Sequence, residues 1–200
     1  MFDKSSSSVW LSYADNSYIA TRLLWFTGFL IETPVNSHRT IELYIKAFLV
    51  GNGIQVKMGS PAWGHKLSDL YKSAVEIDPS IESKDVYRRV KFFERYFDFV
   101  RYPSDKVCPD DGSLTWFSFD SNIAPLDELV AFIRPRVSLD LTDWSKTNIC
   151  NLLADEENAQ PHQLRALKDG NNFIDTINTN ITTSPHVVFD CDFNFDEAGC

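Results

Sequence analysis

The chain has 200 residues, of which 44% are hydrophobic and 14% aromatic. This composition can bury the core of one domain and excludes a disordered protein. The formal net charge is −9 but is divided unevenly: residues 1–107 carry 14 Lys or Arg against 12 Asp or Glu, and residues 108–200 carry 5 against 16. This balance disfavours a protein that binds polyanions over its whole surface, and it leaves room for a local basic stripe in the first half.

Cysteine usage and the apolar runs point to the cytoplasm. Cys108, Cys150, Cys191 and Cys200 form no C-x-x-C pair and no Cys/His knuckle, so we expect free thiols and no metal site. The chain starts without an apolar signal core, and its most apolar run, residues 19–31, is too short and interrupted to cross a bilayer. We therefore expect a cytoplasmic protein without a membrane association. There is no Gly-rich phosphate loop, and no cofactor is predicted.

Hydrophobic periodicity predicts helices along most of the chain. Residues 1–15 are expected to form a flexible lead-in, and the first helix to run from a cap at Asp15, Asn16 or Ser17 to about Ile31, before Thr33-Pro34. The next three helices are expected from a cap at Asn36 or Ser37 to the stop Gly51-Asn52-Gly53, from Gly64-His65 to Asp78-Pro79, and from a cap at Ser83 to Pro103.

The second half is predicted to be helical as well. A fifth helix is expected to start around Pro125 and stop at Pro135, with Leu126, Leu129, Val130 and Ile133 facing inward. Further helices are expected over residues 142–154 and from Pro161. The predicted fold is all-α, an antiparallel four- to five-helix bundle over residues 16–137, followed by a C-terminal helical extension with an acidic tail over 138–200.

Three short motifs, in this order, resemble those of HEPN domains. Glu42 to Leu49 is similar to the E-x-x-x-K-A-x-L helix of that family, Gly64 to Leu70 to the helix start H-D-L-x-x-L, and Arg101-Tyr102-Pro103 to its R-Y-P. The resemblance covers about residues 16–135 and implies a helical bundle that commonly forms a homodimer. Many members are RNases of toxin–antitoxin, defence or RNA-processing systems, and others are non-catalytic partners of nucleotidyltransferases or binders of RNA or ligands.

The family's nuclease motif, an Arg followed after four to six residues by a His, is absent from this chain. In that motif, the Arg would stabilise charge on the phosphate and the His would move protons. The loss of the motif favours a protein without catalytic activity. The remaining enzymatic hypothesis is a metal-independent endoribonuclease whose site combines His65 with Arg101. The alternative for His65 is a structural contact at a helix start, and for Arg101 an interaction with the helix dipole.

A second candidate site is a stripe of basic side chains. Lys84, Arg88, Lys91 and Arg95 are spaced by four, three and four residues, so they share one helix face, with Arg89 nearby, and they could follow a phosphate backbone. We call these four residues the basic stripe. The alternative is an ordinary solvated helix face, tempered by acidic neighbours. Tyr102 and Lys46 are further candidate binding residues, although Lys46 has the spacing of a helical ion pair with Glu42.

The sequence is therefore consistent with three functions. The first is a HEPN-like module without nuclease activity, which binds RNA, a nucleotide or a protein such as a nucleotidyltransferase. The second is the divergent endoribonuclease. The third is a purely structural dimeric component of a larger complex, with the acidic C-terminal half as an interaction segment.

Overall fold

The structure is a computed structural model that describes residues 5–29, 31–56, 64–101, 119–139 and 147–178. Its elements are α1 (Ser5–Phe26), α2 (Glu32–Gly51), α3 (Leu67–Ile77), the 3-10 turn η2 (Pro79–Ile81), α4 (Lys84–Arg101), α5 (Phe119–Ile133), the 3-10 turn η4 (Arg134–Arg136), α7 (Asn148–Ala154), α8 (Pro161–Lys168) and α9 (Ile174–Asn178). No strand occurs among the described residues, and the predicted all-α fold is confirmed. No helix in this part of the chain is both long and apolar enough to cross a bilayer.

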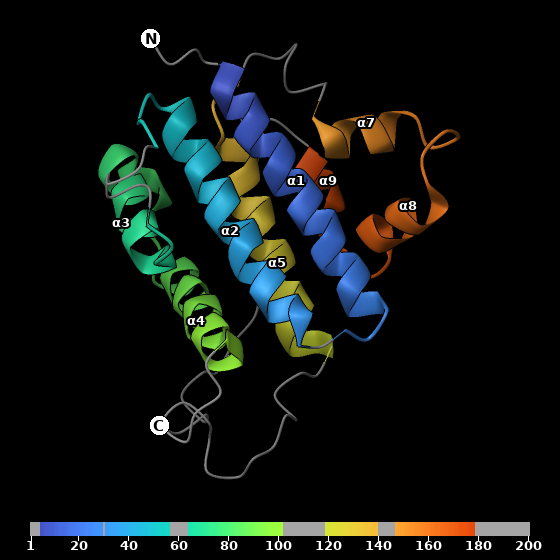
Figure 1. Ribbon diagram of the computed structural model, residues 1–200. Coiled ribbons are helices and arrows are strands. Elements are labelled where there is room, and N and C mark those ends of the chain that lie inside the picture. The colour runs from blue at the N-terminus through green and yellow to red at the C-terminus, as the bar shows by residue number, and fades with distance from the viewer. Residues whose placement is uncertain (1–4, 30, 57–63, 102–118, 140–146, 179–200) are drawn as a thin grey trace.

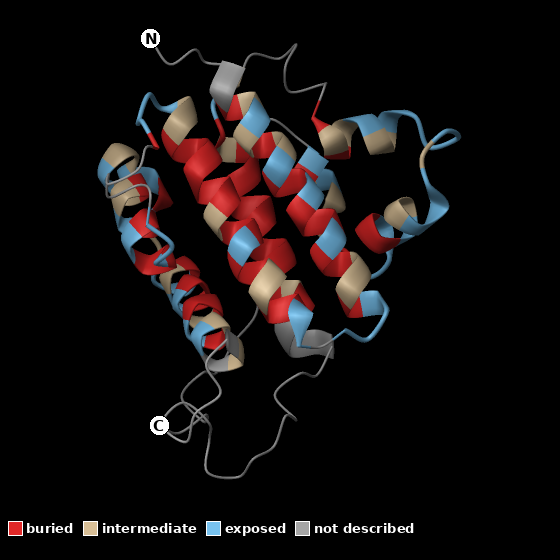
Figure 2. Cartoon of the chain, viewed as in Figure 1, coloured by how far each residue is buried: buried red, intermediate tan, exposed pale blue. Residues whose placement is uncertain are grey.

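The central element of the bundle is α2. It forms an antiparallel hairpin with α1, packs against α3 and α4 along one side, and has α5 behind it (Figure 1). The short helices α7 and α8 lie on the far side of α1, and α9 packs against α5 (Figure 1). Because helices surround it, α2 is buried at every position from Ile41 to Leu49 except Glu42, whereas the outer faces of α1 and α4 are exposed (Figure 2).

The first helix lies earlier in the chain than predicted. Residues 5–15, expected in the flexible lead-in, belong to α1, and the four serines at its start gave no sign of this. The reason is packing: Leu11 and Ala14 are fully buried in the core, so the apolar stripe of α1 begins well before the expected cap. Asp15, expected as a possible cap, is itself fully buried.

The turn between α1 and α2 explains why the predicted end at about Ile31 is wrong. Gly28 adopts φ +78°, and the amides of Gly28 and Phe29 donate to the carbonyls of Trp25 and Leu24, which is the Schellman arrangement that ends a helix. Pro34 instead lies in the first turn of α2, where its missing N–H costs no helical hydrogen bond.

Two other predicted helix boundaries are confirmed, and the start of the third helix is shifted. Gly53, with φ +83°, ends α2 by the same Schellman arrangement. Ser83 caps α4, since its hydroxyl accepts from the amide of Val86 at 3.4 Å. The third helix begins at Leu67, so His65 lies just before it rather than within its first turn.

The helices of the second half are found with shifted starts. α5 begins at Phe119, ahead of the predicted first-turn Pro125, because buried Ile123 extends its apolar face toward the N-terminus. Its predicted inward-facing residues are all buried, and Pro161 does open α8. Of the helix expected over 142–154, α7 covers Asn148–Ala154, and residues 142–146 lie outside the described part.

Candidate functional site

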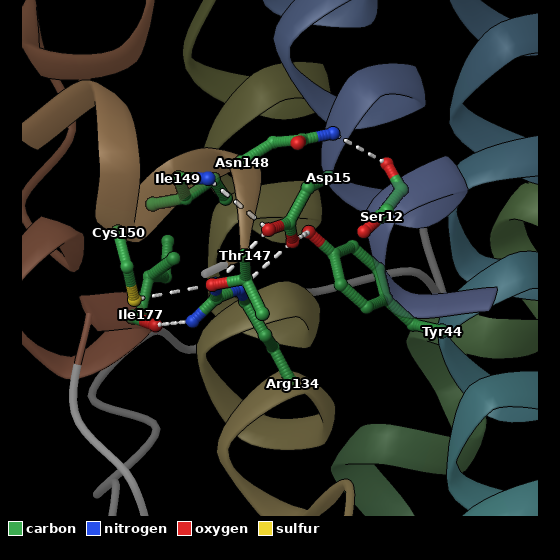
Figure 3. A network of polar contacts seen from close by, with 9 residues as sticks. All are labelled: Ser12, Asp15, Tyr44, Arg134, Thr147, Asn148, Ile149, Cys150 and Ile177. Atoms are coloured by element: carbon green, nitrogen blue, oxygen red, sulfur yellow. Dashed lines mark hydrogen bonds and ion pairs between the residues drawn. The ribbon is translucent and has the colours of Figure 1, made fainter. Parts of the chain in front are cut away.

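A network of polar contacts joins five parts of the chain in the interior (Figure 3). The guanidinium of Arg134 forms a two-pronged pair with Asp15, with Nε–Oδ1 at 2.8 Å and Nη2–Oδ2 at 3.0 Å. Tyr44 donates to the same carboxylate at 2.9 Å, and so does the amide of Ile149 at 3.2 Å. Arg134 also donates to Thr147 at 2.9 Å and to the carbonyl of Ile177. We call these six residues the Asp15 network.

The Asp15 network is structural rather than catalytic. Both members of its ion pair are fully buried, and each group has a partner inside the protein. Burial alone would lower the pKa of Arg134, but the adjoining Asp15 carboxylate outweighs it and raises that pKa. Burial, reinforced by Asp15, raises the pKa of Tyr44. The network ties α7 and α9 to the bundle.

A second buried pair fastens α8. Arg22 of α1 pairs with Asp127 of α5 and also donates to the carbonyls of Ala166 and Asp169. Tyr18 donates to the same Asp127. Burial, which outweighs the opposing effect of Arg22, raises the pKa of Asp127 to about 6. The C-terminal helices therefore share their polar contacts with α1 and α5 instead of packing as a separate unit.

A different polar cluster opens to solvent where α2 meets the start of α3. Glu42 is its centre: Oε1 lies 2.6 Å from Nζ of Lys46 and 3.0 Å from Nδ1 of His65, and Oε2 lies 3.1 Å from the same nitrogen. The His65 side chain is 73% exposed and that of Glu42 only 13%. A carboxylate accepts hydrogen bonds, so Nδ1 of His65 carries the proton, and Nε2 is left as the nitrogen that can act on a ligand.

His38 is a further, buried member of this cluster. It lies one turn before Glu42, with Nδ1 3.9 Å from Oε2, and its ring stacks on Phe97 of α4 with centroids 4.0 Å apart. Burial lowers the pKa of His38 to about 4, against the opposing effect of Glu42 and nearby acids. His38 is therefore neutral at physiological pH. We call His38, Glu42, Lys46 and His65 the Glu42 cluster.

Glu94 connects the start of α3 to the basic stripe. Its carboxylate accepts from the amide of Ser68 at 2.8 Å, at the N-terminus of α3, and from Lys91 at 2.5 Å. Burial alone would raise the pKa of Glu94, but the hydrogen bonds from Lys91 and Ser68 outweigh it and lower that pKa. The bond to Glu94 raises the pKa of Lys91. The start of α3 is thus already occupied by a carboxylate of this chain.

The basic stripe lies on the outer face of α4. Lys84, Arg88, Lys91 and Arg95 are all exposed, and Lys91 is the one member with an ion pair in the described part of the chain. Arg89, expected to support the stripe, points inward instead: it is 2% exposed and pairs with buried Glu128 of α5. Its position on the apolar side of α4 is the reason, because positions 86, 90 and 93 beside it are core residues.

The structure brings together only some of the predicted site residues. His65 contacts Glu42, whereas Arg101 is the last residue of α4 and its side chain lies outside the described part, as does Tyr102. The proposed pairing of His65 with Arg101 therefore stays a prediction. Lys46 is 3% exposed, and its Nζ lies 6.0 Å from the ring centre of Trp10. This burial places Lys46 out of reach of a surface ligand and favours the structural interpretation of its pair with Glu42.

His38 is the member of this site that sequence reasoning missed. The signal was present, since His38, Glu42 and Lys46 are spaced by four residues and so lie along one face of α2. The contact of His65 with that face depends on the path of the chain between α2 and α3, which no local pattern specifies. Among the described residues, no group of three or more His, Cys, Asp or Glu side chains has the geometry of a metal site.

The fold and the motifs together define a helical-bundle protein. The family model described as HEPN domain matches residues 7–113, which is more than half of the chain. The chain therefore belongs to the HEPN domain family, whose members often dimerise. The matched range contains the Glu42 cluster and the basic stripe. No curated protein and no solved structure gives a significant match.

Proposed function

We propose that this HEPN-domain protein binds RNA through the basic stripe of α4 and does not cleave it. The observation that carries the proposal is the exposure of four cations along one side of a single helix, three of them without an ion pair within the described residues. Neighbouring members of the stripe are separated by about 4.5–6 Å along the helix axis. Such a row can contact successive phosphates without reading bases, which predicts salt-dependent binding with little sequence preference.

Fluorescence anisotropy with a labelled single-stranded RNA of mixed sequence tests this proposal. The variant Arg88→Gln with Arg95→Gln is expected to bind roughly tenfold more weakly at low salt and to show a salt slope smaller by about 1.4, roughly 0.7 for each phosphate of the single strand that the variant no longer neutralises. The matched control is Arg165→Gln with Lys168→Gln, which removes two exposed cations from α8 on the other side of α1. Absence of RNA binding at low salt, or equal weakening in both variants, would refute the proposal.

A divergent endoribonuclease is the second candidate, and the pairing of His65 with Glu42 favours it. A carboxylate that holds Nδ1 fixes the imidazole and leaves Nε2 to accept a proton from a ribose hydroxyl. If the protein cleaves RNA, His65→Gln and Glu42→Gln should each abolish cleavage without weakening RNA binding. His162→Gln, which changes an exposed histidine of α8, is the control. Cleavage that persists in both cluster variants would exclude this site.

The protein is further proposed to act as a homodimer, as is common in its family. The turn between α1 and α2 supports this, since Phe29 and Ile31 are 57% and 61% exposed and stand close together in the chain. Light scattering on the purified protein should give twice the chain mass. Phe29→Ser with Ile31→Ser should shift the mass toward the monomer, and a wild-type protein that is monomeric at high concentration would contradict the proposal.

A further inference from the structure

The basic stripe is an exposed face that nothing in the described part of the chain covers. Lys84, Arg88 and Arg95 have no ion pair there, and the acidic turn that joins α7 to α8 is held on the other side of α1. That turn contains exposed Asp155, Glu156 and Glu157, and the helices on either side of it pack against α1. A cationic face of this kind attracts any anionic segment that can reach it.

The last 22 residues of the chain have the complementary chemistry. Residues 179–200, which lie outside the described part, contain no Lys or Arg. Their carboxylates alternate with aromatic rings in the run Phe189-Asp190-Cys191-Asp192-Phe193-Asn194-Phe195-Asp196-Glu197. Carboxylates can pair with the stripe, and phenylalanine rings can stack on arginine guanidinium groups. Half-buried Tyr87 and Phe92 lie beside the stripe on α4 and offer apolar contacts to the same rings.

The segment is long enough to reach the stripe. The described chain ends with α9 at Asn178, and both α9 and α4 pack against α5. Packed helices lie about 8–10 Å apart, so α9 and α4 are separated by roughly 20 Å. Residues 179–189 can span about 36–40 Å when extended. The acidic run 190–197 would cover roughly 23 Å in an extended form, against roughly 17 Å for the stripe.

We propose that residues 179–200 bind in cis to the basic stripe of α4 and compete there with RNA. The competition rests on the proposed RNA binding, whereas the contact itself does not. Tethering gives the segment a local concentration near the millimolar range, so even a weak contact can keep the stripe occupied at low salt. RNA, with a longer row of charges, displaces it. Only polyanions that bind the stripe more strongly than residues 179–200 then occupy it.

The contact is tested first without RNA. A nitroxide label is placed on Cys200 of the full chain, with the other three cysteines replaced by serine, and amide signals are recorded by NMR. Signals of residues 84–95 should broaden at low salt and recover at high salt, while signals of α7 and α8 should not change. Unaffected α4 signals would overturn the proposal, whatever the RNA measurements show. Equal broadening in a mixture of spin-labelled and isotope-labelled chains would overturn binding in cis and point to a second copy.

The competition is tested by RNA anisotropy on full-length variants. Asp190→Asn, Asp192→Asn and Asp196→Asn together should raise RNA affinity five- to tenfold at low salt. The control, Asp155→Asn with Glu156→Gln and Glu157→Gln, removes the same number of charges from the fixed acidic turn and should change affinity less than twofold. Equal increases in both would show a bulk charge effect and overturn the competition. If neither the wild type nor the variants bind RNA, the proposed function fails while the NMR test of the contact still stands.

Discussion

The Asp15 network and the Glu42 cluster each pair a carboxylate with a basic side chain, but only the Glu42 cluster has an exposed member. Arg134 and Asp15 are fully buried and meet four further partners from α2, α7, α9 and the segment before α7. In the Glu42 cluster, His38 and Lys46 are buried while His65 is 73% exposed. A closed network fixes the fold, whereas a cluster with one exposed imidazole can also act on a ligand.

The largest effect is expected from opening the Asp15 network. Arg134→Met leaves the carboxylate of Asp15 buried without its cation, and the unfolding free energy should fall by about 3–5 kcal/mol. Chemical denaturation at neutral pH measures this change. Arg165→Met, which removes an exposed cation paired with Asp169 on the surface of α8, should cost less than about 1 kcal/mol. A decrease of similar size in both variants would mean that burial does not distinguish the two pairs.

The Asp15 network also shows why part of the structure could not be predicted from the sequence. Most of the helices, the glycine stop of α2 and the inward face of α5 follow from local sequence patterns and were predicted, whereas the end of α1 at Gly28 was not. Asp15 was interpreted as a helix cap because its partner, Arg134, is 119 residues away. In the same way, the contact of His65 with Glu42, 23 residues earlier in the chain, was not predicted. Long-range polar contacts depend on how helices are placed in space, which no local pattern records.

The second largest effect is expected in the pH dependence of the unfolding free energy, through buried His38 of the Glu42 cluster. His38 faces Glu42 on its own helix, Glu94 and Asp98 on α4, and His65 before α3, and burial lowers its pKa from 6.5 to about 4. Between these values the unfolded chain binds more protons than the folded one. The stability from neutral His38 is therefore complete above pH 6.5 and is lost as the pH falls toward 4, by at most ~3 kcal/mol.

Denaturation of the wild type and of His38→Phe at pH 7 and pH 4.5 measures this contribution. Phenylalanine keeps a ring against Phe97 and cannot titrate, so the variant should lose less stability between the two pH values than the wild type. His162→Gln should behave as the wild type, because that histidine is exposed. An unchanged pH dependence in His38→Phe would place the titration elsewhere.

A smaller effect on stability is expected at Lys46, which is buried in the Glu42 cluster. Lys46→Met removes the buried cation beside Glu42 and should lower the unfolding free energy by about 1–3 kcal/mol. Its RNA affinity should equal that of the wild type, because Lys46 does not reach the surface of α4 where the basic stripe lies. A variant that folds normally and loses RNA binding would show that Lys46 is a binding residue.

The smallest effect on stability is expected at His65. A substitution there tests most directly whether the Glu42 cluster differs in role from the Asp15 network. A pair with one member 73% exposed is screened by water, so His65→Gln should change the unfolding free energy by less than about 0.5 kcal/mol. The same substitution decides whether the Glu42 cluster has a chemical role. A protein that folds as the wild type and loses RNA cleavage would make His65 catalytic. A decrease in the unfolding free energy of about 2 kcal/mol or more is in the range for a buried group left without its partner. Such a decrease would instead show that His65 is structural, like the residues of the Asp15 network, and that it holds the start of α3 against α2.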